Sequence, residues 1–194
     1  MRITKNPEER KQEILDTALL LFEEQGVAKT SMKDIAERMQ VAKGLLYYYF
    51  ASKEELIIQV VDAFTKEVEG EILKIVAHGQ LGFHEKLRAL IRVFFQAIQE
   101  YPSLMSLGPG NPGIFEFVKT RLSELAMVHA ESLLGQGVEE GHLALAYPNY
   151  MLKILIHGIA DLFVEGITEE TIHLTLIEEA LGLDKGSLRY DKPL

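Results

Sequence analysis

Apolar residues recur every three to four positions along most of the chain, and this spacing predicts amphipathic α-helices. The first helix is predicted over Pro7 to Gln25. Its apolar positions share one face, its charged positions lie opposite, and Gly26 is a natural stop. No segment alternates between apolar and polar residues with the period of a β-strand. The pattern therefore predicts an all-α protein.

Two short helices are predicted to follow. The second begins at Ser31, which has the spacing of a capping box with Asp34 in place of the usual Glu or Gln. The turn Gln40-Val41-Ala42 separates it from a third helix over about Lys43 to Phe50. Two short helices joined by a tight turn form a helix-turn-helix, whose second helix enters the major groove of DNA. Residues 31–50 are thus a candidate DNA-reading unit.

The rest of the chain predicts longer helices. Ser52 is the expected N-cap of the first of these longer helices. They are predicted over about 53–77, 83–100, 114–135, 147–165 and 168–182. The stretch Gly108–Gly113, rich in proline and glycine, is expected to be a loop. The tail after Asp184 is expected to be loosely ordered.

Composition and charge narrow the function. The 194 residues carry a formal charge of −9 and no cysteine, which excludes disulfides and thiolate metal sites. Residues 27–53 nevertheless hold five basic and two acidic side chains, whereas residues 54–194 hold 11 basic and 21 acidic ones. A basic N-terminal segment on an acidic remainder favours nucleic acid as a partner. The N-terminus lacks the apolar run of a signal peptide, and Tyr150 to Val164 is too short and charged to span a membrane. A cytoplasmic protein without a membrane partner is expected.

The third predicted helix has side chains suited to contacting DNA. Leu46 and Phe50 are four residues apart and are expected to pack on the first two helices. The exposed positions would then include Lys43, Gly44, Leu45, Tyr47 and Tyr48, with Tyr49 on the flank. Lysine and tyrosine donate to phosphate oxygens, a glycine allows close approach of the DNA backbone, and a leucine can contact a thymine methyl. Thr30 and Ser31 are candidate phosphate contacts at the start of the second helix, and Lys53 lies near the same surface. The competing interpretation is that the three tyrosines are core or interface aromatics with a purely structural role.

These pieces resemble the DNA-binding domain of the TetR family of bacterial regulators. The matching segments are Ala18–Phe22, Gly26-Val27, Thr30–Ala36, Val41–Phe50 and Ser52–Leu56. The resemblance covers about a quarter of the chain. It implies DNA contacts from Thr30, Ser31, Lys43, Gly44, Leu45, Tyr47, Tyr48, Tyr49 and Lys53. Ala42 and Leu45 depart from the family pattern, in which these positions often carry polar side chains. The departure implies apolar base contacts here.

The resemblance also implies an effector-binding and dimerisation domain at 53–194, after a DNA-binding domain at 1–52. Two apolar stripes on the last two predicted helices agree with a homodimer interface, although one body core could also absorb them. The residues expected at the dimer interface are Met151, Ile154, Leu155, Gly158, Ile159, Leu162, Ile172, Leu176, Ile177 and Ala180. Aromatic, methionine and basic side chains are candidates for a pocket that binds a small, largely apolar effector. They are His84, Arg88, Phe95, Tyr101, Met105, Phe115, Phe117, His129, Tyr150 and His157. Packing in the core is the competing interpretation of each.

The sequence therefore predicts a ligand-responsive, DNA-binding transcriptional regulator. A repressor that releases a near-palindromic operator on binding its effector is the default for the family. The sequence has no motif of a common hydrolase, nucleotide-binding enzyme or zinc protease, so neither an enzyme nor a cofactor or metal site is expected. The alternative is a helical ligand-binding or scaffold protein that does not bind DNA.

Overall fold

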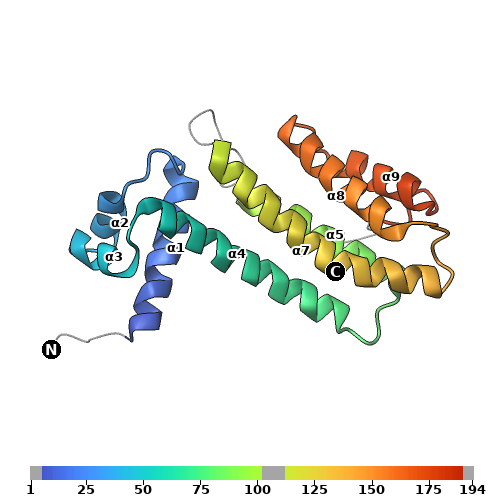
Figure 1. Cartoon of the computed structure of the whole chain (residues 1–194), viewed down its shortest axis with the longest axis horizontal. Coiled ribbons are helices and arrows are strands. Elements are labelled where there is room, and N and C mark those ends of the chain that lie inside the picture. The colour runs from blue at the N-terminus through green and yellow to red at the C-terminus, as the bar shows by residue number, and fades with distance from the viewer. Residues whose placement is uncertain (1–5, 102–111, 190–194) are drawn as a thin grey trace. The chain divides into compact units, whose positions relative to one another are not determined.

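The computed structural model describes residues 6–101 and 112–189, which form eight α-helices and no β-strand (Figure 1). The all-α prediction is confirmed for these residues. The helices are α1 (Pro7–Gln25), α2 (Met32–Arg38), α3 (Lys43–Tyr49), α4 (Lys53–Val76), α5 (Phe83–Glu100), α7 (Pro112–Glu139), α8 (Pro148–Val164) and α9 (Glu170–Leu181). None of these helices is both long and apolar enough to cross a membrane.

The chain divides into two compact units. The first consists of Met1–Glu67 and Glu100–Val118, and the second of Val68–Gln99 and Lys119–Leu194. The first unit thus holds the N-terminal part of α4 as well as α1 to α3. The expected functional boundary between residues 52 and 53 stays a prediction.

The core of the first unit follows the predicted periodicity. In α1 the buried residues are Ile14, Leu15, Ala18, Leu21 and Phe22. The helix α2 packs against both α1 and α3, and α3 contributes Leu46 to the core, with Phe50 buried directly after it. The N-terminus of α4 is capped as predicted, because the Ser52 hydroxyl accepts a hydrogen bond of 3.1 Å from the backbone N–H of Glu55. These short helices are therefore held by packing rather than by their own length.

The second unit is a helical bundle in which α8 and α9 pack against each other. The helix α5 approaches α7 closely at Gly137, where an added Cβ would overlap the ring of Phe83. A larger residue at 137 would separate the two helices, so this glycine is needed for packing.

Two sequence predictions in the C-terminal half are wrong. The helix α7 begins at Pro112 instead of 114, inside the stretch expected to be a loop, because proline is tolerated in the first turn of a helix. The segment after Asp184, expected to be loosely ordered, is held by hydrogen bonds up to residue 189. The buried carboxylate of Glu178 accepts hydrogen bonds of 2.8 Å from the backbone N–H groups of Gly186 and Leu188, and Leu188 is fully buried.

Candidate nucleic-acid interface

The start of α2 is fixed by the predicted capping box. The Ser31 hydroxyl accepts a hydrogen bond of 3.2 Å from the backbone N–H of Asp34, and the Asp34 carboxylate accepts one of 2.7 Å from the N–H of Ser31. The Ser31 hydroxyl also donates to this carboxylate, and this bond is the largest of the effects that lower the pKa of Asp34. Asp34 stays ionised at neutral pH and holds the exposed Ser31 at the entry to the helix.

The turn between α2 and α3 is a Schellman motif. Gln40 has a φ of +56°, in the left-handed region that non-glycine residues rarely adopt. The N–H of Val41 bonds to the carbonyl of Ala36 and the N–H of Gln40 to that of Glu37. These bonds satisfy the last carbonyls of α2 and set the direction in which α3 leaves the turn.

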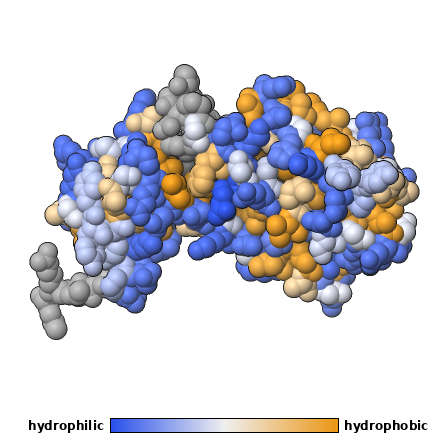
Figure 2. Space-filling view, in the orientation of Figure 1, coloured by the Kyte–Doolittle hydropathy of each residue, from blue (hydrophilic) through white to orange (hydrophobic). Residues whose placement is uncertain are grey.

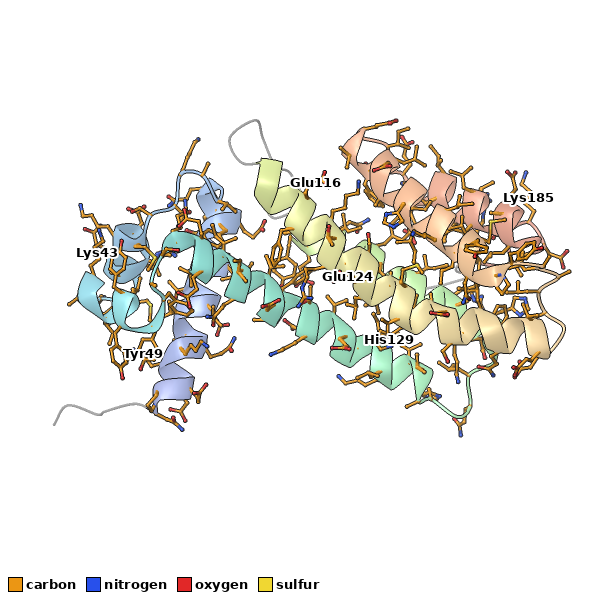
Figure 3. All side chains as sticks on the ribbon, viewed as in Figure 1. Lys43, Tyr49, Glu116, Glu124, His129 and Lys185 are labelled. Atoms are coloured by element: carbon orange, nitrogen blue, oxygen red, sulfur yellow. The ribbon has the colours of Figure 1, made fainter. Side chains whose placement is uncertain are left out.

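The helix α3 has one buried face and one exposed face, as the sequence predicts. Leu46 is fully buried, whereas Tyr47 and Tyr48 are exposed, Tyr48 to 79%. Lys43 and Gly44 are exposed, and Leu45 and Tyr49 are half-buried. Figure 3 shows the side chains of Lys43 and Tyr49 on this helix. The ammonium of Lys43 lies 5.3 Å from the centre of the Tyr47 ring, a cation–π distance.

Gly44 has no structural reason to be a glycine. An added Cβ would meet no atom within 4 Å, and its φ is not in the left-handed region. The packing of the protein does not require this glycine, so its missing side chain leaves room for a partner that approaches from outside. It lies beside the exposed Lys43, on the surface that α3 presents to solvent.

The prediction that Thr30 offers a free hydroxyl to a phosphate is wrong. Its side chain is only 1% exposed. The Thr30 Oγ1 lies 3.1 Å from the carbonyl oxygen of Leu21 and 3.0 Å from that of Gly26, and it accepts a bond from the Gln25 amide. The backbone N–H of Thr30 also bonds to Gly26. Thr30 therefore ties the end of α1 to the loop that precedes α2.

Lys53, another predicted phosphate contact, has a partner within the protein. Its ammonium donates a hydrogen bond of 2.6 Å to the carbonyl oxygen of Val27, and the carbonyl oxygen of Ala28 lies 3.5 Å away. Partial burial lowers the pKa of Lys53, and the charges of Glu54 and Asp34 partly oppose that shift. The first residue of α4 thus holds the loop between α1 and α2.

The candidate effector residues are divided between the two units of the chain. Met105 and the side chain of Phe115 lie outside the described part of the structure, and Tyr101 and Phe117 belong to the first unit. The Tyr101 ring packs on Phe64 there. The prediction that Tyr150 and His157 line a pocket is wrong, because both are exposed on α8.

The remaining candidates lie in the second unit. His84 and Arg88 are half-buried and Phe95 is buried on α5. His84 belongs to a ring cluster with Phe83 and His142, and Phe83 stacks on His142 at 5.3 Å between ring centres. His129, labelled in Figure 3, lies 3.4 Å from the Glu69 carboxylate. Among the described residues, no group of three or more His, Asp or Glu side chains could hold a metal ion.

Sequence reasoning missed His173, which is fully buried on α9 beside Phe163 and Phe95. One signal was present, because His173 lies four and eight residues before the buried Ile177 and Leu181 and so shares their face. A histidine at a core position of a helix is the pattern that could have found it.

The expected dimer residues form an exposed apolar face on α8 and α9. Ile154 is 68% exposed, and Ile172 and Leu176 are also exposed. Gly158 is exposed on the same helix as Ile154, and Met151, Leu155, Ile159, Leu162 and Ala180 are half-buried. Figure 2 shows apolar surface over this part of the second unit. Ile177 is buried within its own unit, so its assignment to a subunit interface is wrong.

Comparison with known proteins agrees with the geometry. Residues 14–60 match the family model described as bacterial regulatory proteins, tetR family. The chain is 34% identical to the HTH-type transcriptional repressor KstR2 of Rhodococcus jostii over 50% of this chain and 48% of the relative. It is 30% identical to the HTH-type regulator YuxN of Bacillus subtilis over 81% of this chain and 54% of the relative. The chain thus spans about half the length of these two relatives.

Solved structures show the same fold. A TetR/AcrR-family regulator from Thermobifida fusca matches with a TM-score of 0.62 and 22% identity, covering 95% of this chain and 100% of that one. A tetR-family regulator from Streptomyces coelicolor matches with a TM-score of 0.68 and 20% identity, covering 96% and 85%. These comparisons give no support to the alternative of a scaffold without DNA-binding activity.

Proposed function

Since the chain belongs to the TetR family of bacterial regulatory proteins, we propose that it is a ligand-responsive regulator of transcription. As a homodimer it represses by binding a near-palindromic DNA operator, and it releases this operator when a small, largely apolar effector binds. The DNA-reading role belongs to residues 1–52, and the effector and dimer roles belong to residues 53–194.

The observation that carries the proposal is the surface of α3. Lys43, Tyr47 and Tyr48 are exposed around a glycine that the packing of the protein does not need. Large aromatic side chains are rarely left exposed together on a helix without a partner. Their hydroxyls and the Lys43 ammonium donate to phosphates, and Leu45, half-buried beside them, faces a base. Ser31 and Tyr49 complete the phosphate contacts at the edges.

The two-fold symmetry of the dimer matches the near-palindromic symmetry of the operator. The exposed apolar residues of α8 and α9, with Ile154 and Ile172 at their centre, would be covered by the same residues of a second subunit. Two reading helices then address half-sites separated by about one helical turn, roughly 34–36 Å. The effector acts by binding more tightly to a conformation in which the two reading helices no longer match this spacing.

The test is a fluorescence-anisotropy titration of the full chain against the DNA upstream of its own gene. A scrambled duplex serves as the control, and both are measured at two salt concentrations. The proposal predicts selective binding that weakens as salt rises, because phosphate contacts release counterions. Absence of binding to either duplex at low salt would refute it.

A further inference from the structure

His173 of α9 lies in an aromatic enclosure built by three helices of the second unit. Its imidazole is 0% exposed. The ring of Phe163, on α8, stacks on it with 4.5 Å between centres and an interplanar angle of 5°. Phe95, on α5, lies 5.4 Å from the same ring and 5.5 Å from Phe163. A polar ring is thus surrounded by apolar walls.

One nitrogen of this ring has a partner that selects the tautomer of the neutral imidazole. The Nε2 atom lies 2.7 Å from the backbone carbonyl oxygen of Ile167, in the loop between α8 and α9. A carbonyl oxygen only accepts hydrogen bonds, so Nε2 of the neutral ring carries the hydrogen and donates it. The other nitrogen, Nδ1, therefore has a free lone pair and is an acceptor.

The Nδ1 acceptor and the Ser187 hydroxyl are the buried side-chain groups without a hydrogen-bond partner in the described part of the protein. The Nδ1 atom is buried and has no hydrogen-bond partner there. Buried polar atoms are almost always paired, because an unpaired one loses its bond to water without a replacement. A phenylalanine at this position would keep the aromatic packing and avoid the unpaired acceptor, but it would lose the bond to Ile167. The described chain thus supplies no donor to an acceptor whose ring lies beside two phenylalanines, and a donor supplied from outside would satisfy it.

We propose that Nδ1 of His173 accepts a hydrogen bond from the hydroxyl group of the effector, whose apolar body lies against Phe95 and Phe163. The ligand class is a neutral alcohol or phenol. A ketone or ether has only lone pairs to offer to Nδ1, and a carboxylate or ammonium would bring an unpaired charge into an apolar enclosure. Phe163 is half-buried, unlike the other two rings, so the ligand enters past it.

This binding site rests on the function proposed above, because that function requires an effector. It also connects the bound effector to the proposed dimer interface. His173 bonds to the loop between α8 and α9, and both helices carry the exposed apolar face assigned to the dimer. A ligand that inserts beside Phe163 moves α8 relative to α9, and this changes the surface that the two subunits share.

The experiment uses four small probes and the full-length protein. Benzyl alcohol and cyclohexanol are each compared with their methyl ethers, which keep the apolar body and lose the donor. Binding is followed by ¹⁵N spectra of the histidine side chains. Each alcohol should shift the Nδ1 resonance of His173 and bind about fivefold tighter than its ether. Equal binding of alcohol and ether, or no shift of this resonance up to the solubility limits, overturns the proposal.

Two substitutions separate the two ring nitrogens. His173→Gln keeps a donor at the position that serves Ile167 but removes the acceptor at the δ position, whereas His173→Asn does the reverse. The preference for alcohols should persist in the Asn variant and vanish in the Gln variant. Persistence in both would mean that the selectivity lies elsewhere. The spectra of the wild-type protein stand independently if either variant fails to fold.

Operator binding measured on the same wild-type sample distinguishes failure of the His173 site from failure of the proposed function. Selective DNA binding without alcohol selectivity refutes the role of His173 and leaves the proposed function intact. Alcohol selectivity without DNA binding refutes the proposed function and leaves the binding site.

Discussion

The ammonium of Lys53 and the backbone carbonyl of Val27 form a hydrogen bond of 2.6 Å that joins residues 26 positions apart. It connects the first turn of α4 to the loop that leads into α2. Lys43, the other lysine of the proposed DNA surface, lies over the Tyr47 ring instead. We expect the two lysines to contribute in different ways.

Replacing each lysine by methionine tests this difference. Lys53→Met should lower the free energy of unfolding by about 1–2 kcal/mol, because a charge-assisted hydrogen bond is lost, and should leave the salt dependence of DNA binding unchanged. Lys43→Met should leave stability within about 0.5 kcal/mol and reduce the salt slope by about one unit. Urea unfolding and anisotropy at several salt concentrations measure the two effects. A reduced slope in Lys53→Met would assign Lys53 to a phosphate.

Tyr47→Phe should weaken binding to every duplex by up to about tenfold, because a hydroxyl that donates to phosphate is lost while the ring is kept. Tyr147→Phe is the matched control, because Tyr147 is exposed like Tyr47 but lies outside residues 1–52. Anisotropy titrations with specific and scrambled DNA measure both. Unchanged affinity in Tyr47→Phe would remove its hydroxyl from the interface.

Leu45→Thr should change which sequence is preferred while leaving nonspecific affinity nearly the same. An apolar contact is replaced by a hydroxyl at a position that we propose to face a base, and such changes alter discrimination by roughly tenfold or more. Selection from a randomised operator library shows the preference of each variant. An identical consensus would show that Leu45 reads no base.

Thr30→Val should lower the free energy of unfolding by about 1–3 kcal/mol, because the buried carbonyl of Leu21 and the part-buried carbonyl of Gly26 lose a donor. The folded fraction should bind DNA with an unchanged salt slope. Thr30→Ser is the control that retains the hydroxyl. A loss of DNA affinity without a loss of stability would contradict the structural role of Thr30.

Ile154→Glu should dissociate the dimer by raising its Kd at least about thirtyfold, because a charge replaces a central apolar contact. Operator affinity should fall with it, since the two half-site contacts are no longer linked. Val128→Glu is the matched control, because Val128 is similarly exposed but lies on α7. Sedimentation equilibrium measures the oligomeric state. A dimer that survives in Ile154→Glu would place the interface elsewhere.

The local structure of the protein is predictable from its amino-acid sequence alone. Helical periodicity placed Leu46 and Phe50 inside and Tyr47 and Tyr48 outside, because residues four apart on a helix must share a face whatever packs against it. The capping box at Ser31 and Asp34 is equally local, since both partners lie within one turn. These features needed no knowledge of the rest of the fold.

Which polar side chains are free to bind a partner depends on packing between distant segments. Thr30 and Lys53 matched a phosphate-binding pattern, yet their partners are backbone carbonyls brought near by packing. His173 packs against aromatic rings from two other helices, and Glu178 bonds to the backbone of a segment whose composition alone predicts a loose tail. A polar atom satisfies its hydrogen bond with whatever the folded chain places beside it, and that neighbour is set by packing between segments distant in sequence.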